Sequence, residues 1–296
     1  MVKEMDKGIK IAYLILAHTA PIQLANVAKR LSNTGDVYVH INRRVKLRPF
    51  VEAVSHINAD NIFFVAKRYN VHWGGMSIVR ATMEMLDNAV GRQHYDRFIL
   101  LTGLDYPIMT DSEMLNFWAS NREIDYIHAD KVTGDDLAHL KHVHYRDSRV
   151  TSILGDFLIR RFPNAKMLKK DDYVVVGRKN YVLYGIAPKW CLTGESGEYL
   201  LDFYKHQKKY NKYFTFSHAP DDFYVATVIL NSGMHEVNVD RDMFYMHWIP
   251  GDNGATTKVF KLSDWQELKE SGCMFAKRFL SDESNELIKK LNGSEI

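Results

Sequence analysis

The sequence predicts an α/β protein built on a mainly parallel mixed sheet that is flanked by helices. In the first half of the chain, short apolar runs typical of buried strands alternate with segments of helical spacing. Strands separated by helices form parallel sheets covered on both faces, and such sheets bind ligands beyond the carboxyl ends of their strands. With 296 residues, of which 46% are hydrophobic, the chain can bury a full core. The loops after the predicted strands are therefore the first place to look for a functional site.

The predicted elements of the first half follow one another without a break in pattern. Mostly apolar runs indicate the strands, and apolar residues three and four positions apart indicate the helices. Strands are expected at Ile9–Leu16, Val37–Ile41, Ile62–Val65 and Arg97–Leu101, and helices at Ile22–Leu31 and Ser77–Val90. No internal repeat, low-complexity tract or Pro/Gly/Ser-rich linker divides the chain, so we expect a single domain over residues 1–296.

The charge balance argues against one large class of proteins. The chain has 39 Lys and Arg against 36 Asp and Glu, and the resulting charge of +3 is too small and too dispersed for a nucleic-acid binder. Basic pairs such as Lys208-Lys209 and Lys289-Lys290 are interpreted as solvated faces. A role for them in peripheral contact with an anionic membrane surface stays open.

Cysteine usage and the start of the chain indicate a cellular location. Cys191 and Cys273 by themselves can form neither a disulfide framework nor a zinc site, so we expect packed thiols in a reducing cytoplasm. Residues 1–7 are rich in charge, and the apolar run Ile11–Ala17 is far shorter than a membrane span. We therefore expect a soluble cytoplasmic protein without a targeting segment.

Two adjacent carboxylates stand out in the second half of the chain. Asp221 and Asp222 follow Pro220, and proline suits the first turn of a helix because its φ angle is fixed. Both acids would then lie at the positive end of a helix over Phe223–Leu230, where a carboxylate is a candidate general base. The alternative is that they only complement the helix dipole.

Side chains with useful chemistry follow the predicted strands. Glycine lets a backbone approach a ligand, tryptophan offers a stacking face, and asparagine or aspartate accepts hydrogen bonds. The residues of this kind are His18, Asn42, Trp73, Gly74, Gly103 and Asp105. Together they outline a polar pocket for a sugar or a nucleotide, although His18 could be a core histidine and Gly74 part of a turn. The Gly-rich motifs of dinucleotide oxidoreductases and P-loop proteins do not occur.

An ordered set of motifs extends over nearly the whole chain, from about residue 9 to residue 290. The set comprises His18, His40-Ile41-Asn42, Trp73-Gly74-Gly75-x-Ser77, Leu101-Thr102-Gly103-x-Asp105-Tyr106-Pro107-Ile108, Gly185 with Trp190-x-Leu192-Thr193, Ala219-Pro220-Asp221-Asp222, Trp248 and Phe275-Ala276-Lys277-Arg278-Phe279. In this order the motifs resemble the core-2/I-branching glycosyltransferases. That family includes β-1,6-N-acetylglucosaminyltransferases and peptide O-xylosyltransferases.

The resemblance implies a GT-A type fold, a UDP-sugar donor and inversion at the anomeric carbon without a divalent metal or other cofactor. Two basic side chains near the C-terminus would replace the metal, and by position these match Lys258 and Arg278, with Lys261 and Lys277 as alternatives. Fixed cations in a partly dry cleft can stabilise the charge that develops on the leaving diphosphate.

The resemblance also divides the chain by role. Residues of about 9–125 would bind the donor through the loop side chains named above, and residues of about 126–296 would hold the acceptor and the catalytic groups. Trp190 and Trp248 match positions on the acceptor side, where an indole can stack on a sugar, although each would otherwise be assigned to the core.

Two departures from the family pattern affect the site. Asp222 stands where the family has glutamate as the base, so its side chain is one methylene shorter and the backbone or the acceptor must shift to compensate. Asp221 would orient the base or the acceptor. Asn42 stands where the family more often has an aspartate that contacts the uridine end of the donor, and its amide can still form hydrogen bonds.

The tripeptide Asp240-Arg241-Asp242 matches the Asp-x-Asp pattern with which many GT-A enzymes hold a metal. It lies late in the chain, before an apparent strand at Met243–Tyr245, whereas the metal motif follows the donor-binding strands. We interpret it as surface carboxylates that flank an arginine.

The sequence thus predicts an inverting glycosyltransferase that moves a sugar, expected to be GlcNAc in β-1,6 linkage, from a UDP-sugar to a glycan or lipid-linked oligosaccharide at the inner membrane face. Transfer of xylose or another sugar by the same family is one alternative, and an inactive nucleotide-sugar or glycan binder is another. Acceptor specificity is expected in the loop Asp130–Asp147. Its histidines His139, His142 and His144 are interpreted as solvated rather than metal-binding.

Overall fold

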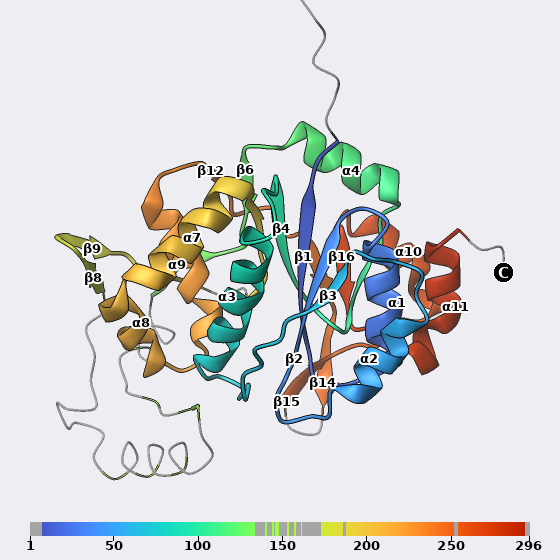
Figure 1. Cartoon of the computed structure of the whole chain (residues 1–296), viewed down its shortest axis with the longest axis horizontal. Coiled ribbons are helices and arrows are strands. Elements are labelled where there is room, and N and C mark those ends of the chain that lie inside the picture. The colour runs from blue at the N-terminus through green and yellow to red at the C-terminus, as the bar shows by residue number, and fades with distance from the viewer. Residues whose placement is uncertain are drawn as a thin grey trace, which may run out of the picture.

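The computed structural model describes residues 8–133, 140, 144, 146–147, 153, 157, 161, 173–185, 188–251 and 254–293. Within these residues the central feature is a seven-stranded sheet with the order β12-β6-β11-β4-β1-β2-β3 (Figure 1). Its strands are β1 (Ile11–Ala17), β2 (Asp36–Ile41), β3 (Ile62–Phe64), β4 (Arg97–Thr102), β6 (Ile124–Tyr126), β11 (Cys191–Thr193) and β12 (Glu236–Asn238). Strand β11 runs antiparallel to β4 and β6, and the other pairings are parallel. The predicted mainly parallel mixed sheet is confirmed.

The elements predicted for the first half of the chain are all present, with boundaries that shift by one or two residues. Helix α3 (Ser77–Val90) has the predicted bounds, and α1 (Pro21–Leu31) begins one residue early because Pro21 suits the first helical turn. Helix α2 (Arg48–Ser55) is absent from the prediction. Only two of its residues, Phe50 and Val54, are buried, and two apolar positions give a weak periodic signal.

Helices cover both faces of the sheet, as the prediction requires. Alternate side chains of β1 enter two separate cores, because successive residues of a strand point to opposite faces. Tyr13 and Ile15 pack with α1, whereas Ala12 and Leu14 pack with α3. In Figure 1, α1, α10 (Trp265–Glu270) and α11 (Ser281–Leu291) lie on one side, and α3, α7 (Gly194–His206) and α9 (Tyr224–Ser232) on the other.

A smaller sheet is joined to the end of β4. It has the order β13-β16-β5, with β5 at Asp105–Pro107, β13 at Phe244–Met246 and β16 at Phe275–Lys277. Because β5 follows β4 almost directly, this sheet brings the C-terminal part of the chain to the carboxyl edge of the central sheet. Short pairs complete the β-structure: β7 (Asp130–Lys131) with β10 (Tyr184–Gly185), β8 (Val174–Val176) with β9 (Lys179–Tyr181), and β14 (Trp248–Gly251) with β15 (Gly254–Thr257). Helix α8 spans Lys208–Thr215.

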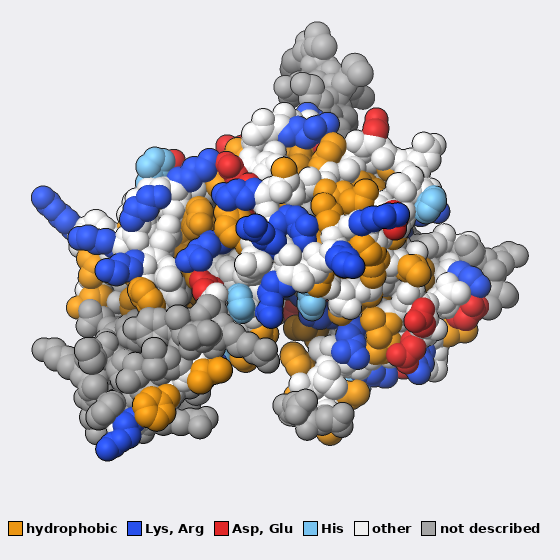
Figure 2. All heavy atoms as spheres, turned by 60° about the horizontal axis from the view of Figure 1, so that its bottom comes forward, with side chains coloured by type: hydrophobic (Ala, Val, Ile, Leu, Met, Phe, Trp, Pro, Cys, Tyr) orange, Lys and Arg blue, Asp and Glu red, His pale blue; other side chains and the backbone are white. Residues whose placement is uncertain are grey.

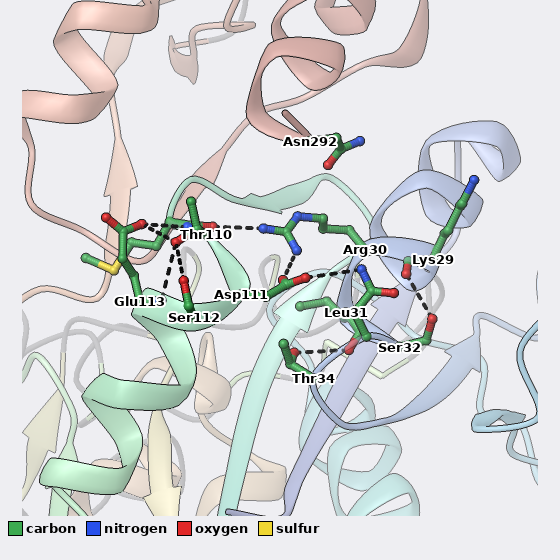
Figure 3. A network of polar contacts seen from close by, with 12 residues as sticks. Lys29, Arg30, Leu31, Ser32, Thr34, Thr110, Asp111, Ser112, Glu113 and Asn292 are labelled. Atoms are coloured by element: carbon green, nitrogen blue, oxygen red, sulfur yellow. Dashed lines mark hydrogen bonds and ion pairs between the residues drawn. The ribbon is translucent and has the colours of Figure 1, made fainter. Parts of the chain in front are cut away.

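A polar network fastens α1 to α4 (Asp111–Ser120), near the end of the molecule at which β1 begins (Figures 1 and 3). The buried Arg30 forms an ion pair with Asp111 and donates a hydrogen bond to the Met109 carbonyl at 3.1 Å. Thr110 and Glu113 form a capping box, in which the Glu113 amide donates to Thr110 Oγ1 at 3.3 Å and the Thr110 amide donates to Glu113 Oε2 at 2.7 Å. These contacts lie away from the carboxyl edge and leave that edge to the site.

Two expectations drawn from composition bear on this fold. Cys191 and Cys273 are free and buried, as expected of packed thiols. Among the residues that the structure describes, no helix combines the length and the apolar character needed to cross a membrane.

Candidate active site

The loops after β1, β2 and β4 meet at the carboxyl edge of the sheet. The Asn42 amide donates to the Ala17 carbonyl at 2.9 Å, and the Gly103 amide donates to the Leu16 carbonyl at 3.0 Å, so both loops bracket the end of β1. His18 follows immediately and is exposed, not a core histidine. Figure 2 shows this edge turned forward, with a hollow near its centre and Lys, Arg and His side chains around the rim.

Two residues at the end of β2 hold the loop that leads to Trp73. The Asn42 side chain pairs with the backbone of Val71: Nδ2 donates to the Val71 carbonyl at 2.9 Å, and Oδ1 accepts from the Val71 amide at 3.1 Å. His40 Nε2 accepts from the Tyr69 amide at 2.9 Å, and burial lowers the pKa of His40 to about 4, so its ring is neutral. Asn42 therefore positions the loop that leads to Trp73.

Both glycines of the Trp73-Gly74-Gly75 segment are required by the local structure. Gly74 has a φ of +70°, a backbone conformation that residues with a side chain rarely adopt. A Cβ atom on Gly75 would collide with Asp147 Oδ1, which accepts a hydrogen bond from the Ser77 amide at 2.9 Å at the start of α3. Trp73 is 78% exposed, and its ring is available for stacking on a ligand.

This segment packs against the loop that carries the two carboxylates. The Ala219 amide donates to the Gly74 carbonyl at 3.0 Å, and the Trp73 ring meets the His218 ring edge to face with centroids 5.3 Å apart. The fold thus brings together two of the predicted site segments, which are far apart in the sequence.

The two carboxylates lie in a turn of their own. Asp222 and Phe223 donate their amides to the carbonyls three residues earlier, at 3.1 and 3.2 Å, which makes Pro220–Asp222 a 3₁₀ turn. Helix α9 begins only at Tyr224. The prediction that both acids belong to the first turn of one continuous helix is wrong, because the chain turns at Phe223 before the helix starts.

Burial makes both carboxylates unusually basic. Burial, and secondarily the charge of Asp221, raises the pKa of Asp222 to about 7, and burial raises the pKa of Asp221 to about 6. Among the described residues, no hydrogen-bond partner reaches Asp221 Oδ1. Both acids are half-buried, and a base with a pKa near 7 is suited to proton transfer at neutral pH.

Gly185 sets the position of the residue that follows Asp222. A Cβ atom on Gly185 would collide with the ring of Phe223, so only glycine leaves room for this ring. The Tyr184 amide donates to Thr227 Oγ1 at 3.0 Å and ties β10 to α9 at the same place. The predicted Gly185 motif therefore contributes packing behind the carboxylates.

The C-terminal basic residues are joined by a backbone ladder. The Lys258 amide donates to the His247 carbonyl at 2.8 Å, and the Arg278 amide donates to the Lys258 carbonyl at 3.3 Å. Because Trp248 follows His247, the ladder brings the predicted residues Trp248, Lys258 and Arg278 onto neighbouring segments.

The four basic residues considered as diphosphate ligands differ in whether a carboxylate lies beside them. Lys258 Nζ lies 2.8 Å from Asp264 Oδ1 and 3.0 Å from Glu267 Oε2, and Lys261 Nζ lies 2.9 Å from Glu283 Oε2. In the part of the chain that the structure describes, no acid forms an ion pair with Lys277 or Arg278, which leaves these two to attract an anion.

The carboxylate of Glu267 anchors the segment around Trp248. Its Oε1 accepts from the Tyr245 hydroxyl at 2.9 Å and lies 2.5 Å from His247 Nδ1. Burial raises the pKa of Glu267, but hydrogen bonds from His247, Lys258 and Tyr245 outweigh this effect and lower it to about 2. Glu267 therefore stays ionised and holds Lys258. The sequence analysis missed this residue, whose partners lie 9 to 22 positions away.

Two of the residues predicted to contact ligands, Asp105 and Trp190, have buried side chains. Asp105 is fully buried: Oδ2 accepts from Thr102 Oγ1 at 2.8 Å, and Oδ1 forms an ion pair with Lys189. It stabilises the turn after β4 and has no face open to a ligand. Trp190 is 1% exposed and belongs to the core, whereas Trp248 is 59% exposed and remains available for stacking.

A cavity of about 450 Å³ lies next to Trp248. Asp242 lines it, whereas Asp240 does not. Asp240, Arg241 and Asp242 are all exposed, as the surface interpretation requires. Among the described residues, no three His, Cys, Asp or Glu side chains cluster in a way that could hold a metal ion.

The predicted acceptor loop is described only in part. His139 and His142 lie outside the described residues. His144 is described, and its ring centroid lies 5.3 Å from that of His218, close to the carboxylate turn.

We expect Gly185→Ala to lower the free energy of unfolding by about 1–3 kcal/mol, because the added methyl group must displace the ring of Phe223. Thermal or denaturant unfolding measures this loss. Gly177→Ala is a suitable control, since a methyl group there would meet no atom within 4 Å, although the φ of +63° adds local strain. An unchanged free energy of unfolding in Gly185→Ala would show that the Phe223 ring is not held against Gly185.

Comparison with known proteins identifies the family. The family model described as Core-2/I-Branching enzyme matches residues 11–272. Xylosyltransferase 2 of Rattus norvegicus is 23% identical over 311 residues, and that of Homo sapiens is 24% identical over 314. Each alignment covers 96% of this chain and 33% of the relative. Xylosyltransferase oxt of Drosophila melanogaster is 22% identical over 302 residues, covering 93% and 32%. The chain thus spans about a third of the length of these relatives. Its sheet and flanking helices are consistent with a GT-A type fold. Because the family model matches most of the chain, the protein belongs to the Core-2/I-Branching enzyme family.

Proposed function

We propose that this protein is an inverting glycosyltransferase that moves a sugar from a UDP-sugar to a glycan hydroxyl, with Asp222 as the general base. The observation that carries this proposal is the half-buried pair of acids in the Pro220–Asp222 turn, held against the Trp73-Gly74 segment. Burial raises the pKa of Asp222 to about 7, so near neutral pH it can accept a proton that an ordinary aspartate would leave in place.

In the proposed reaction, the acceptor oxygen attacks the anomeric carbon from the face opposite UDP. Its proton passes to Asp222, a new carbon–oxygen bond forms, and the bond between the sugar and the diphosphate breaks. Asp221, which lies in the same turn, orients the base or the acceptor. The stereochemistry inverts because attack and departure occur on opposite faces.

The departing UDP carries the negative charge of the bond that breaks. We propose that Arg278 and Lys258 neutralise this charge without a divalent metal. Arg278 is the stronger candidate, because Asp264 and Glu267 already offset the charge of Lys258. Lys277 is next to Arg278 and adds to the same positive region.

GlcNAc and xylose are both candidate donor sugars. The matching family model is described as a branching enzyme, and on that ground we propose GlcNAc as the donor sugar of this protein, transferred in β-1,6 linkage. The relatives named above are xylosyltransferases, and this favours xylose as the second candidate. The acceptor would be a glycan or a lipid-linked oligosaccharide.

The direct test is UDP release from a panel of UDP-sugars that includes UDP-GlcNAc and UDP-xylose, with EDTA or with added Mn²⁺. We expect release from one donor at a rate that EDTA does not change. Release that requires Mn²⁺ would contradict metal independence. Binding of UDP without release from any donor, even with glycan acceptors present, would favour an inactive binding protein.

Asp222→Asn should retain UDP binding but lower turnover at least about a hundredfold, the usual scale for a positioned base. Because the wild-type carboxyl is protonated below its pKa of about 7, wild-type turnover should rise with pH through about 7 and then level off. The variant should lack this step. Turnover near the wild-type rate would assign the base to another residue, and Asp221→Asn tests the nearest one.

Arg278→Ala should weaken UDP binding more than Lys258→Ala, because Lys258 is already paired with two carboxylates. Calorimetric titration with UDP measures both effects. Lys261→Ala is the matched control, since Lys261 is exposed and paired with Glu283. Equal UDP affinity in all three variants and the wild type would overturn the assignment of these cations.

A further inference from the structure

The β8–β9 hairpin projects at the opposite end of the molecule from α11 (Figure 1). Its inward face is buried: Val174 and Tyr181 lie directly opposite each other, and the Tyr181 ring centroid is 5.9 Å from that of Phe203 in α7. Successive side chains of a strand point to opposite faces, and those of the outward face are each 38% to 46% exposed: Tyr173, Val175 and Val182. Single exposed hydrophobic side chains are ordinary, but three on one short hairpin indicate an interaction surface.

Basic residues lie near this apolar face. Hairpin residues 173–182 contain Arg178 and Lys179 and no acid. Helix α8 packs beside the hairpin, with the Tyr210 and Tyr181 ring centroids 6.2 Å apart. This helix also contains no acid, and its basic residues are Lys208, Lys209 and Lys212. All five cations are exposed. Figure 2 shows Lys and Arg side chains beside hydrophobic ones at this end of the molecule, on the left of the view.

No carboxylate forms an ion pair with these five cations in the part of the chain that the structure describes. The ion pairs at the end of α7 involve other residues: Lys205 pairs with Asp87, and His206 Nδ1 lies 3.0 Å from Asp202 Oδ1. Residues 169–172, just before the hairpin, are two lysines and two aspartates, whose formal charges cancel. The whole chain has a charge of only +3, so the five cations exceed the net charge of the entire protein. The positive charge is therefore concentrated at this end.

Exposed apolar side chains next to cations fit an anionic lipid bilayer better than a second copy of the chain or a nucleic acid. Aliphatic and tyrosine side chains enter the interfacial layer of a bilayer, while Lys and Arg contact lipid phosphates and keep their apolar stems on the surface. A symmetric dimer uses the same patch on both subunits, so it would bring five cations against the same five. A nucleic acid would leave the apolar face of the hairpin without a partner.

We propose that the β8–β9 hairpin and α8 form a docking surface for an anionic lipid bilayer. Val175 and its two apolar neighbours on the outward face contact the interfacial layer, and Arg178 with the lysines of α8 contacts lipid phosphates. Each basic residue near an anionic bilayer strengthens binding about fivefold, so several together attach the protein in a salt-sensitive way. None of these residues belongs to the candidate active site, and the docking surface is therefore independent of the proposed transfer reaction.

Flotation of the intact protein with lipid vesicles tests this surface. The vesicles contain phosphatidylcholine alone or with about 30% phosphatidylglycerol, and the salt concentration is raised from about 0.1 M to about 0.5 M. We expect at least about tenfold tighter binding to the anionic vesicles at the lower salt concentration. Most of this difference should disappear at the higher salt concentration, because screening shortens the reach of the charges.

A variant that removes the three cations of α8 should bind anionic vesicles at least about tenfold more weakly. It combines Lys208→Gln, Lys209→Gln and Lys212→Gln. The matched control removes three exposed lysines from α10 and α11, at the opposite end of the molecule (Figure 1), and combines Lys269→Gln, Lys289→Gln and Lys290→Gln. Because its net charge changes by the same amount, the control should stay within about twofold of the wild type if the position of the charges matters.

The apolar contribution is tested separately. The double variant Val175→Ser and Val182→Ser leaves every charge in place and should weaken binding to anionic vesicles at least about threefold, since it removes apolar area from the outward face. Light scattering of the same variant tests the other occupant. A wild-type dimer that the double variant converts to a monomer would assign the surface to a second copy of the chain and overturn the proposal.

Three further results would overturn it: equal binding to both kinds of vesicle, equal losses in the α8 variant and its control, or wild-type binding by the double valine variant. The lipid and salt dependence of the wild-type protein needs no substitution, so it decides the question even where a variant fails to fold. UDP release enters none of these measurements, and a protein without transferase activity would give the same vesicle binding.

Discussion

The site depends on the buried ion pair between Asp105 and Lys189. Asp105 ends the turn after β4 and accepts hydrogen bonds from Thr102, while Lys189 lies just before β11, the strand beside β4. In the smaller sheet, Asp105 faces Lys277 across the β5–β16 pair. One carboxylate thus joins the central sheet, the cavity and the basic C-terminal segment. Loss of either partner would leave an uncompensated buried charge, at a cost of about 3–5 kcal/mol.

Among the described residues, no cation forms an ion pair with the two acids of the Pro220–Asp222 turn. Their pKa values of about 6 and 7 lie above the unfolded value near 4, so the folded protein binds more protons than the unfolded chain between these limits. The free energy of unfolding must therefore fall as the pH rises through this interval. The fold retains a destabilising arrangement at one place, and this is typical of sites where reactivity opposes stability.

The basic residues near the C-terminus differ in whether a carboxylate offsets their charge. Glu267 is held ionised by three hydrogen-bond donors, and together with Asp264 it fixes the ammonium of Lys258. The charge of Lys258 is consequently offset by two carboxylates, whereas no acid of the described residues forms an ion pair with Arg278. Among the described residues, Lys277 and Arg278 are therefore the basic candidates that no neighbouring carboxylate offsets.

Sequence alone determined the α/β class, the strands and helices of the first half, the family resemblance and the pairing of Asp221 with Asp222. These features follow from the local spacing of apolar residues and from the order of the motifs, both of which can be read from one sequence. Tertiary structure decided which residues are accessible. Trp190 and Trp248 cannot be told apart by pattern, yet one is buried and the other exposed. The structural role of Asp105 became clear only from its ion pair with Lys189. The partial neutralisation of Lys258 became clear only from its ion pair with Glu267. Burial and charge depend on partners that are distant in sequence, and only the folded chain brings those partners together.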